Sequence, residues 1–133
     1  MRVVFDANIL ISAFTLPGGS GDRALEVILD GRATLLISKA ILGETLRVLG
    51  SKFGRDREEL ARLAVFLADL AEIVAPGQTI RALADDPDNR VLECAVAGGA
   101  AVVVTGDRAM LALRRLQGVE IVTLREFLRR TVP

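Results

Sequence analysis

The chain has 133 residues, of which 51% are hydrophobic, and its 17 basic residues balance 17 acidic ones. This length and apolar content predict one globular domain with a substantial core, spanning residues 1–133. No apolar run reaches the roughly 18 residues that a membrane span requires. Asp6 interrupts the first apolar stretch, so a signal peptide is not expected. The single cysteine excludes an internal disulfide, and these features together predict a cytoplasmic protein.

Strand and helix patterns alternate along the chain. Short apolar runs predict strands at 2–5, 33–38, 101–105 and 119–123, with a further short strand within 72–75. Helical patterns cover 22–31, 39–50 and 56–74, and further helices follow Asp86 and Thr123. The strands are continuous apolar runs without polar alternation, which is typical of a parallel sheet. We therefore predict a single-domain α/β/α sandwich with a parallel sheet of four to five strands.

Several predicted helices begin with residues that cap helix N-termini. The expected caps are Ser20 or Asp22, Ser38, Asp56 with Glu59, and Thr123 with Glu126. Pro87 favours a first helical turn, which makes Asp86 the expected N-cap of the helix that follows.

Two acidic residues follow predicted buried strands. Asp6 ends the first strand, and Asp107 comes two residues after the run at 101–105. Ligands of open parallel sheets bind beyond the carboxyl ends of the strands. If these two strands are neighbours, both carboxylates project into one crevice.

Further acidic candidates lie on helices. Glu44 falls just outside the apolar face of its helix, so it either reaches over the sheet edge or keeps its carboxylate in water. Asp85, Asp86 and Asp88 surround a helix start, where capping and solvation explain at least two of the three. Glu93 lies later on the same helix. Its side chain is either exposed to solvent or extends into the crevice as a further acid.

The available side chains restrict the chemistry of such a crevice. The sequence contains no histidine, which excludes His-based triads and His-ligated zinc, and Cys94 is expected to be a small buried thiol. A site built of carboxylates suits hard, oxygen-preferring cations. Converging carboxylates repel, so without a metal at least one of them should have a raised pKa.

Four stretches carry a family resemblance: "VVFDANILISA", "ISKAILGETLRVL", "DDPDNRVLECAVAGGA" and "VVVTGDRAML". In order and spacing they resemble the PIN-domain nucleases, and most closely the VapC-type toxin components of toxin–antitoxin systems. The resemblance extends from Arg2 to about Leu128. It implies a PIN-like domain with a divalent-metal-dependent endoribonuclease activity that uses Mg²⁺ or Mn²⁺ to cleave RNA. It also implies a small antitoxin protein as a partner.

The same resemblance implies roles for individual residues. The catalytic acids that it implies are Asp6, Glu44, Asp88 and Asp107, supported by Asn8 and Thr105. We expect Asp6, Asp88 and Asp107 to be the metal ligands, and Glu44 to orient or deprotonate the attacking water. The two supporting residues would hold the carboxylate rotamers and contact phosphate.

The third acid has alternatives, because many relatives carry it one or two residues later, where this chain has Asn89 and Arg90. Asp86 or Glu93 could therefore share the role given to Asp88. Arg90 or Arg108 is expected to hold the RNA backbone.

Other functions fit the sequence less well. A response-regulator receiver requires an acidic pair after the first strand and a lysine after a late strand, but Lys39 and Lys52 are misplaced. A phosphatase of the haloacid dehalogenase type requires Asp-x-Asp, and Asn8 occupies the second position. Two alternatives within the PIN fold stay open: a housekeeping RNA-processing nuclease, and an inactive module for RNA binding or assembly.

Apolar helices such as the stretch "LARLAVFLADLAEIV" give the chain more apolar surface than one small sheet can cover. This surface predicts a homodimer, or a larger homo-oligomer built from it, with helices at the interface.

Overall fold

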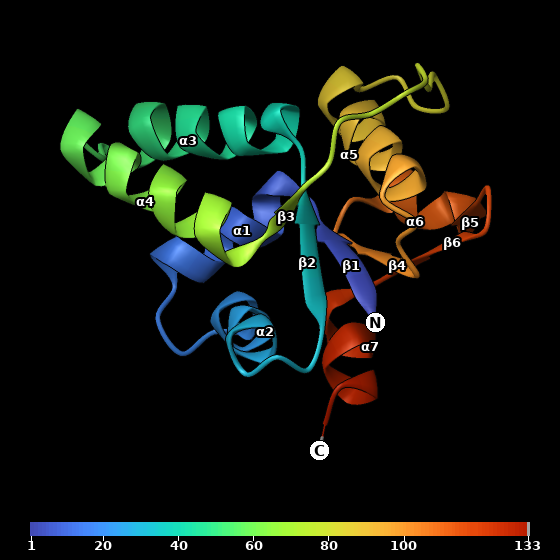
Figure 1. Ribbon diagram of the computed structural model, residues 1–133, viewed down its shortest axis with the longest axis horizontal. Coiled ribbons are helices and arrows are strands. Elements are labelled where there is room, and N and C mark those ends of the chain that lie inside the picture. Colours follow the sequence, from blue (N-terminus) through green and yellow to red (C-terminus); the bar gives the residue numbers. More distant parts are fainter. Residues whose placement is uncertain (133) are drawn as a thin grey trace.

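The computed structural model describes residues 1–132, which form seven helices and a six-stranded sheet (Figure 1). The strands are β1 (Arg2–Phe5), β2 (Thr34–Ile37), β3 (Glu72–Ile73), β4 (Val102–Val104), β5 (Arg115–Leu116) and β6 (Val119–Val122). The helices are α1 (Ala7–Thr15), α2 (Ser20–Leu29), α3 (Lys39–Phe53), α4 (Arg57–Leu70), α5 (Asp86–Ala97), α6 (Arg108–Leu113) and α7 (Leu124–Arg130).

The sheet order is β3-β2-β1-β4-β6-β5, and every neighbouring pair is parallel except β5 with β6. In Figure 1, helices α1 to α4 lie on one side of β1 and β2, and α5 and α6 lie on the other. This arrangement confirms the predicted α/β class with a mainly parallel sheet. None of the helices within residues 1–132 combines the length and apolarity needed to cross a membrane.

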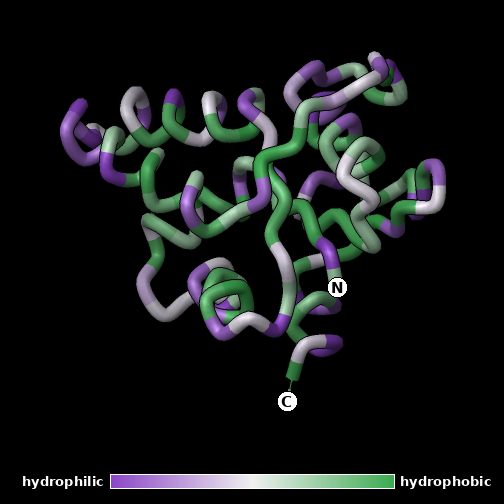
Figure 2. The backbone as a smooth tube through the Cα atoms, in the orientation of Figure 1, coloured by the Kyte–Doolittle hydropathy of each residue, from purple (hydrophilic) through white to green (hydrophobic). Residues whose placement is uncertain are grey.

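The core lies along the central strands β1, β2, β4 and β6. Residues 3–5 of β1 and all of β4 are buried, and they pair in the register Val3↔Val102 to Phe5↔Val104. Figure 2 shows these strands as a hydrophobic centre with hydrophilic residues on the outer turns of the helices. Since helices cover both faces, the strands bury both sets of side chains, which explains their continuous apolar sequence.

Three of the predicted helix caps are confirmed. The side chain of Ser38 accepts a hydrogen bond from the Ile41 N–H, that of Asp56 from the Glu59 N–H, and that of Thr123 from the Glu126 N–H. These bonds join residues three positions apart, so they are encoded in the local sequence.

Two predicted caps are wrong. The N-cap of α2 is Gly19, which has no side chain to bond, while the Asp22 carboxylate accepts the Gly18 N–H at 2.8 Å and closes the preceding loop. The N-cap of α5 is Asp85, whose carboxylate accepts the Asp88 N–H, and Asp86 is the first helical residue. A proline is tolerated anywhere in the first turn, where N–H groups have no helical partner, so Pro87 does not specify which residue is the cap.

Three elements, α1, α6 and β5, were not predicted from the sequence. Helix α1 is apolar enough to resemble a continuation of β1, and α6 and β5 are short. The missed α1 matters for the site, because Asp6 is its N-cap.

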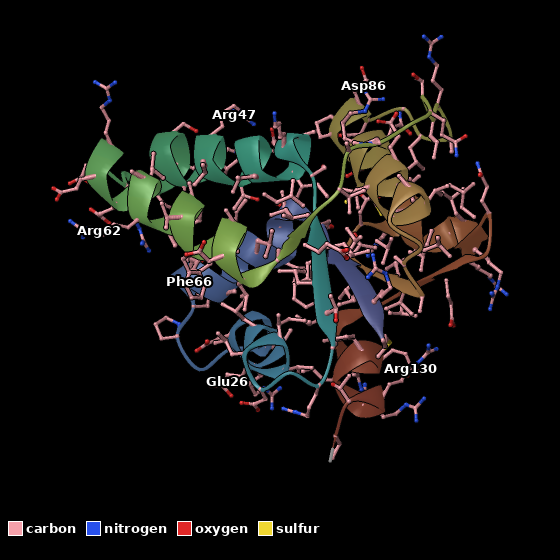
Figure 3. The ribbon with its side chains drawn as sticks, in the orientation of Figure 1. Glu26, Arg47, Arg62, Phe66, Asp86 and Arg130 are labelled. Carbon is pink, nitrogen blue, oxygen red and sulfur yellow. The ribbon has the colours of Figure 1, made fainter. Side chains whose placement is uncertain are left out.

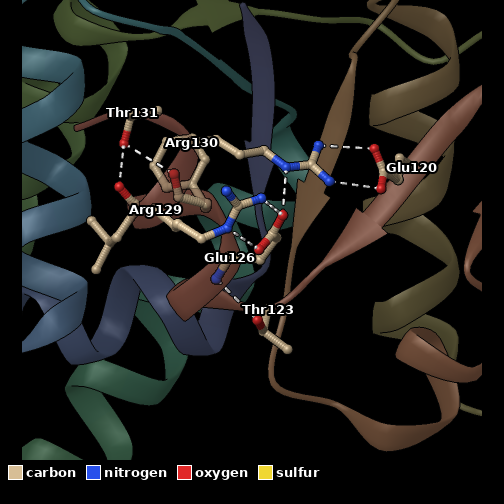
Figure 4. A network of polar contacts seen from close by, with 8 residues as sticks. Glu120, Thr123, Glu126, Arg129, Arg130 and Thr131 are labelled. Carbon is tan, nitrogen blue, oxygen red and sulfur yellow. Dashed lines mark hydrogen bonds and ion pairs between the residues drawn. The ribbon is translucent and has the colours of Figure 1, made fainter. Parts of the chain in front are cut away.

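Helix α7 is held against β6 by a network of charges (Figure 4). Arg130 donates two hydrogen bonds to Glu120 on β6 and one to Glu126, which also accepts two from Arg129. The guanidinium groups of Arg129 and Arg130 lower the pKa of Glu126 to about 2. Because these groups are exposed, the network orients the C-terminal helix more than it stabilises the fold.

Helices α1 and α2 pack closely at Gly21, where an added Cβ would lie 2.2 Å from the Ser12 Oγ and 2.9 Å from the Ala13 nitrogen. We predict that Gly21→Ala lowers the free energy of unfolding by about 1–3 kcal/mol, because the two helices must separate. Gly43→Ala is the control: this helical glycine has open space around it, so alanine should be neutral or slightly stabilising. Urea unfolding measures both, and a Gly21→Ala variant as stable as the wild type would contradict the close packing.

Candidate functional site

The adjacent ends of β1 and β4 are joined by a buried pair of polar side chains. Asp6 is only 3% exposed, and its Oδ1 accepts the Ile9 N–H at 2.9 Å as the cap of α1. Its Oδ2 accepts a 2.5 Å hydrogen bond from the hydroxyl of Thr105, which follows β4 and is fully buried. The Asp6 carboxylate is thus satisfied on both oxygens and held in one orientation.

Asp107 belongs to the same hydrogen-bonded group. Its backbone N–H donates to the Thr105 Oγ1 at 3.0 Å, and its Oδ2 caps α6 by accepting the Met110 N–H at 2.8 Å. The first strand and the run at 101–105 are neighbours, and one threonine connects the two aspartates that follow these strands.

A crevice opens beside Asp6, between α1, α3 and the start of α5. Its wall consists of Asp6, Ala7, Asn8, Ala40, Ile41, Glu44, Asp85, Pro87, Asp88 and Val91. Three of the four acids implied by the resemblance line this wall, together with Asn8. Asp107 and Thr105 are outside the wall, but both act on Asp6 directly.

The negative charges around this crevice perturb one another. Burial raises the pKa of Asp88 to about 6, and the charges of Asp85, Asp107 and Asp6 contribute to the increase. Burial also raises the pKa of Asp6, against the hydrogen bonds from Thr105 and Ile9 that favour its ionised form. At least one of these acids therefore has a raised pKa, as predicted, but burial and not the predicted repulsion is the main cause.

Glu44 is in a different electrostatic environment. Arg47, one turn further along α3, donates to both of its carboxylate oxygens at 2.8 and 3.2 Å. These hydrogen bonds lower the pKa of Glu44. Figure 3 shows Arg47 on the outer side of α3, so Glu44 is an ionised group at the rim of the crevice.

Asp86 and Glu93, the alternatives to Asp88, are directed elsewhere. Asp86 is exposed at the start of α5 (Figure 3) and is not part of the crevice wall. Glu93 is buried, accepts the Ile80 N–H at 2.8 Å and lies 2.8 Å from the Arg90 Nε. Arg90 is therefore engaged with Glu93, whereas Arg108 is exposed beside Asp107.

Asp85 is the wall residue that sequence reasoning missed, since it treated this residue as one of several solvated or capping acids. The aspartate pair before Pro87 is the only sequence signal for it. Its charge is the second cause of the raised pKa of Asp88, after burial.

The donor set of the crevice fits a hard divalent cation. It consists of carboxylate oxygens whose mutual repulsion a cation would relieve. Within residues 1–132, however, no three acidic side chains stand close enough to hold one ion together. The acids gather around one crevice without forming a complete coordination shell.

The raised pKa of Asp88 has a consequence for stability. Between the ordinary pKa of 3.8 and about 6 the native protein binds more protons at this site than the unfolded chain, so metal-free stability falls as pH rises through this range. We predict that Asp88→Asn, in EDTA, melts higher than the wild type at pH 7 and loses most of this advantage near pH 4. Asp86→Asn, an exposed change in the same turn, should show no such pH-dependent gain. Thermal melts of the three proteins at several pH values test this prediction. An Asp88→Asn variant less stable than the wild type at pH 7 would contradict an unfavourable charge on Asp88 in the native protein.

Comparisons with known proteins agree with this fold. The family model of the PIN domain matches residues 2–109. The uncharacterized protein MJ1680 of Methanocaldococcus jannaschii is 25% identical over 118 residues, which cover 86% of this chain and 76% of that protein.

Two solved structures share the fold, both with a TM-score of 0.63. VapBC2 from Rickettsia felis, bound to a DNA fragment from its promoter, is 20% identical and covers 92% of this chain and 98% of its own. VapBC-1 from nontypeable Haemophilus influenzae is 15% identical and covers 94% of this chain and 99% of its own. The family model matches most of the chain, and three of the four acids of the resemblance line one crevice, so the chain belongs to the PIN-domain family.

Proposed function

We propose that this protein is a divalent-metal-dependent endoribonuclease that cleaves RNA phosphodiester bonds. The observation that carries the proposal is that Asp6, Glu44 and Asp88 line one crevice, with Asp107 connected to Asp6 through Thr105. Such crowding destabilises the metal-free fold, and a cation site is the simplest reason to retain it. Membership of the PIN-domain family supports a nuclease activity.

In this proposal Asp6, Asp88 and Asp107 would hold Mg²⁺ or Mn²⁺ through their carboxylate oxygens. When bound, the cation would neutralise charge on the scissile phosphate and make water more acidic. Thr105 fixes the rotamer of Asp6 through its hydroxyl, as a supporting residue should.

Glu44 and Asn8 act on the substrate side of the crevice. Glu44 is ionised at neutral pH and lines the crevice, so it can orient the attacking water, whereas its lowered pKa makes it a weak proton acceptor. Asn8 lies in the crevice wall and can donate its amide N–H to a phosphate oxygen. Arg108, exposed beside Asp107, is available to contact the RNA backbone.

A toxin role in the cytoplasm, with a small antitoxin as partner, is the finer form of this proposal. The shared fold with the two VapBC structures and the resemblance of the four sequence stretches support it. Induced expression of the wild type should then arrest growth, whereas Asp88→Asn should not. Cleavage in vitro without growth arrest would favour the housekeeping nuclease instead.

The activity is tested by cleavage of single-stranded RNA. We predict cleavage in Mg²⁺ or Mn²⁺, none in EDTA, and a loss of at least about a hundredfold in Asp88→Asn and in Asp107→Asn, which keeps a capping side chain. Asp86→Asn should retain activity. Mg²⁺ should also raise the melting temperature of the wild type more than that of Asp88→Asn. Undiminished cleavage in EDTA by purified protein would refute the metal mechanism, and RNA binding without cleavage would indicate an inactive module.

We also propose a homodimer, or a larger homo-oligomer, with α4 at the interface. Of the residues of α4 only Leu67 is buried, while Val65 is 62% exposed and Phe66 is 37% exposed. An apolar face of this kind is typical of a surface that another subunit covers.

Light scattering measures the assembly. We predict a dimer or larger species at tens of micromolar and a shift toward monomer in Val65→Asp, since a buried unpaired charge opposes association. Arg62→Asp is the control, because it changes the charge on the same helix at a position that is already charged. It should shift the assembly toward monomer less than Val65→Asp does. A strictly monomeric wild type would contradict the proposal.

A further inference from the structure

A second cavity lies next to the acidic crevice and shares one wall residue with it, Ala40. We call it the Glu93 pocket. Its volume is about 230 Å³. Its apolar wall is formed by Ala40 and the extended segment Ile73–Pro76, and its polar side by Ser38, Lys39, Arg90 and Glu93. The pocket therefore lies where α3 begins, between the end of β3 and the middle of α5.

The polar side of this pocket holds an ion pair between buried Glu93 and half-buried Arg90, and its hydrogen bonds are incomplete. The Glu93 side chain is 8% exposed, and its Oε2 accepts the Ile80 N–H. Its Oε1 lies 2.8 Å from the Arg90 Nε. That contact lacks hydrogen-bond alignment, and within the described residues the buried Nε has no hydrogen-bond acceptor. A buried nitrogen without an acceptor is unfavourable, so a further group that accepts from the Arg90 guanidinium would stabilise this arrangement.

We propose that the Glu93 pocket receives one nucleobase of the RNA strand, with guanine as the best match. This inference rests on the proposed function. The apolar wall can contact the face of a base, while the Glu93 carboxylate accepts from N1–H and N2–H and the Arg90 guanidinium donates to O6. Recognition of unstacked bases through their Watson–Crick edges is how proteins read single-stranded RNA.

The size and position of the pocket support a single base. Its volume lies below the roughly 300 Å³ at which pockets for drug-sized ligands begin. Because Ala40 separates the two cavities, a strand with its phosphate at the crevice has a neighbouring base within reach of the pocket. Lys39 adds a cation at the same wall for the phosphate attached to that base.

Other occupants complete the ion pair less well. An apolar side chain from a protein partner would fill the cavity but leave the Arg90 Nε without an acceptor. The Watson–Crick edge of adenine places its N1 acceptor beside its donor, so a carboxylate can pair with one atom only. Guanine offers two donors beside an acceptor, which matches a carboxylate next to a guanidinium.

Binding can be tested without any cleavage. The methyl groups of Ile73 and Val74 report on the pocket, and their NMR shifts are followed while the wild type is titrated with GMP, AMP, CMP, UMP or inorganic phosphate. We expect saturable shifts with GMP at the lowest concentration, no shift of these methyls with inorganic phosphate, and loss of the GMP preference in Glu93→Gln. That variant keeps an acceptor for the Ile80 N–H, so its fold should be maintained. Absence of shifts with all four nucleotides, or equal shifts with phosphate alone, would overturn the proposal.

Cleavage of a randomised RNA pool gives the second test. We expect guanine to be enriched beside the bond cut by the wild type, and Ala75→Leu, which narrows the pocket at an exposed position, to reduce this enrichment at least about tenfold. Ala101→Leu adds the same volume at an exposed position before β4, at the opposite end of this strand from Thr105, and should leave the preference unchanged. An unaltered guanine preference in Ala75→Leu would overturn the base assignment. If the wild type cuts no RNA, the proposed nuclease function fails, and the nucleotide titration still decides the pocket.

Discussion

The hydrogen bond from the Thr105 hydroxyl to the Asp6 carboxylate joins the ends of the two central strands, and the geometry of the site depends on it. A carboxylate as buried as Asp6 is unfavourable unless both oxygens accept hydrogen bonds. The Ile9 N–H supplies one bond and Thr105 the other, and Thr105 in turn receives the Asp107 N–H. The parallel pairing of β1 with β4 is the condition for this chain of bonds, because it places residues 6 and 105 at the same edge of the sheet.

The same architecture explains why so many acids meet at one edge. In a parallel sheet, the helix that follows each strand begins near its carboxyl end, and the positive end of its dipole favours a carboxylate. Asp6 and Asp107 cap α1 and α6 there, and Asp85 caps α5. Capping alone therefore accounts for three of the carboxylates. Asp88 differs, because its carboxylate is placed among these charges without serving as a cap, so it is the residue that most clearly indicates a ligand site.

Helix α5 serves two sides of the molecule. Its first turn presents Asp85 and Asp88 to the crevice, while Asn89 and Glu93 hold the irregular segment before the helix. The Asn89 amide accepts the Leu83 N–H and donates to the Leu83 carbonyl, so backbone groups that have no strand partner are satisfied by side chains. Asn89 and Glu93 lie on one buried face of α5. From this face they hold the segment before the helix, which leads to Asp85 and Asp88, and Glu93 also forms part of the wall of the Glu93 pocket.

The sequence by itself determined the features that arise from short-range forces. Continuous apolar runs identified the four main strands and the parallel α/β class, and the caps at Ser38, Asp56 and Thr123 were readable because each bond spans three residues. A family pattern placed acids at four positions, but their surroundings could not be derived from it. Tertiary structure alone decided that Asp85 joins the crevice and that Glu93 faces a different pocket. The reason is physical: helix periodicity restricts a side chain to one face, whereas its burial and its partners depend on which distant segments pack against that face.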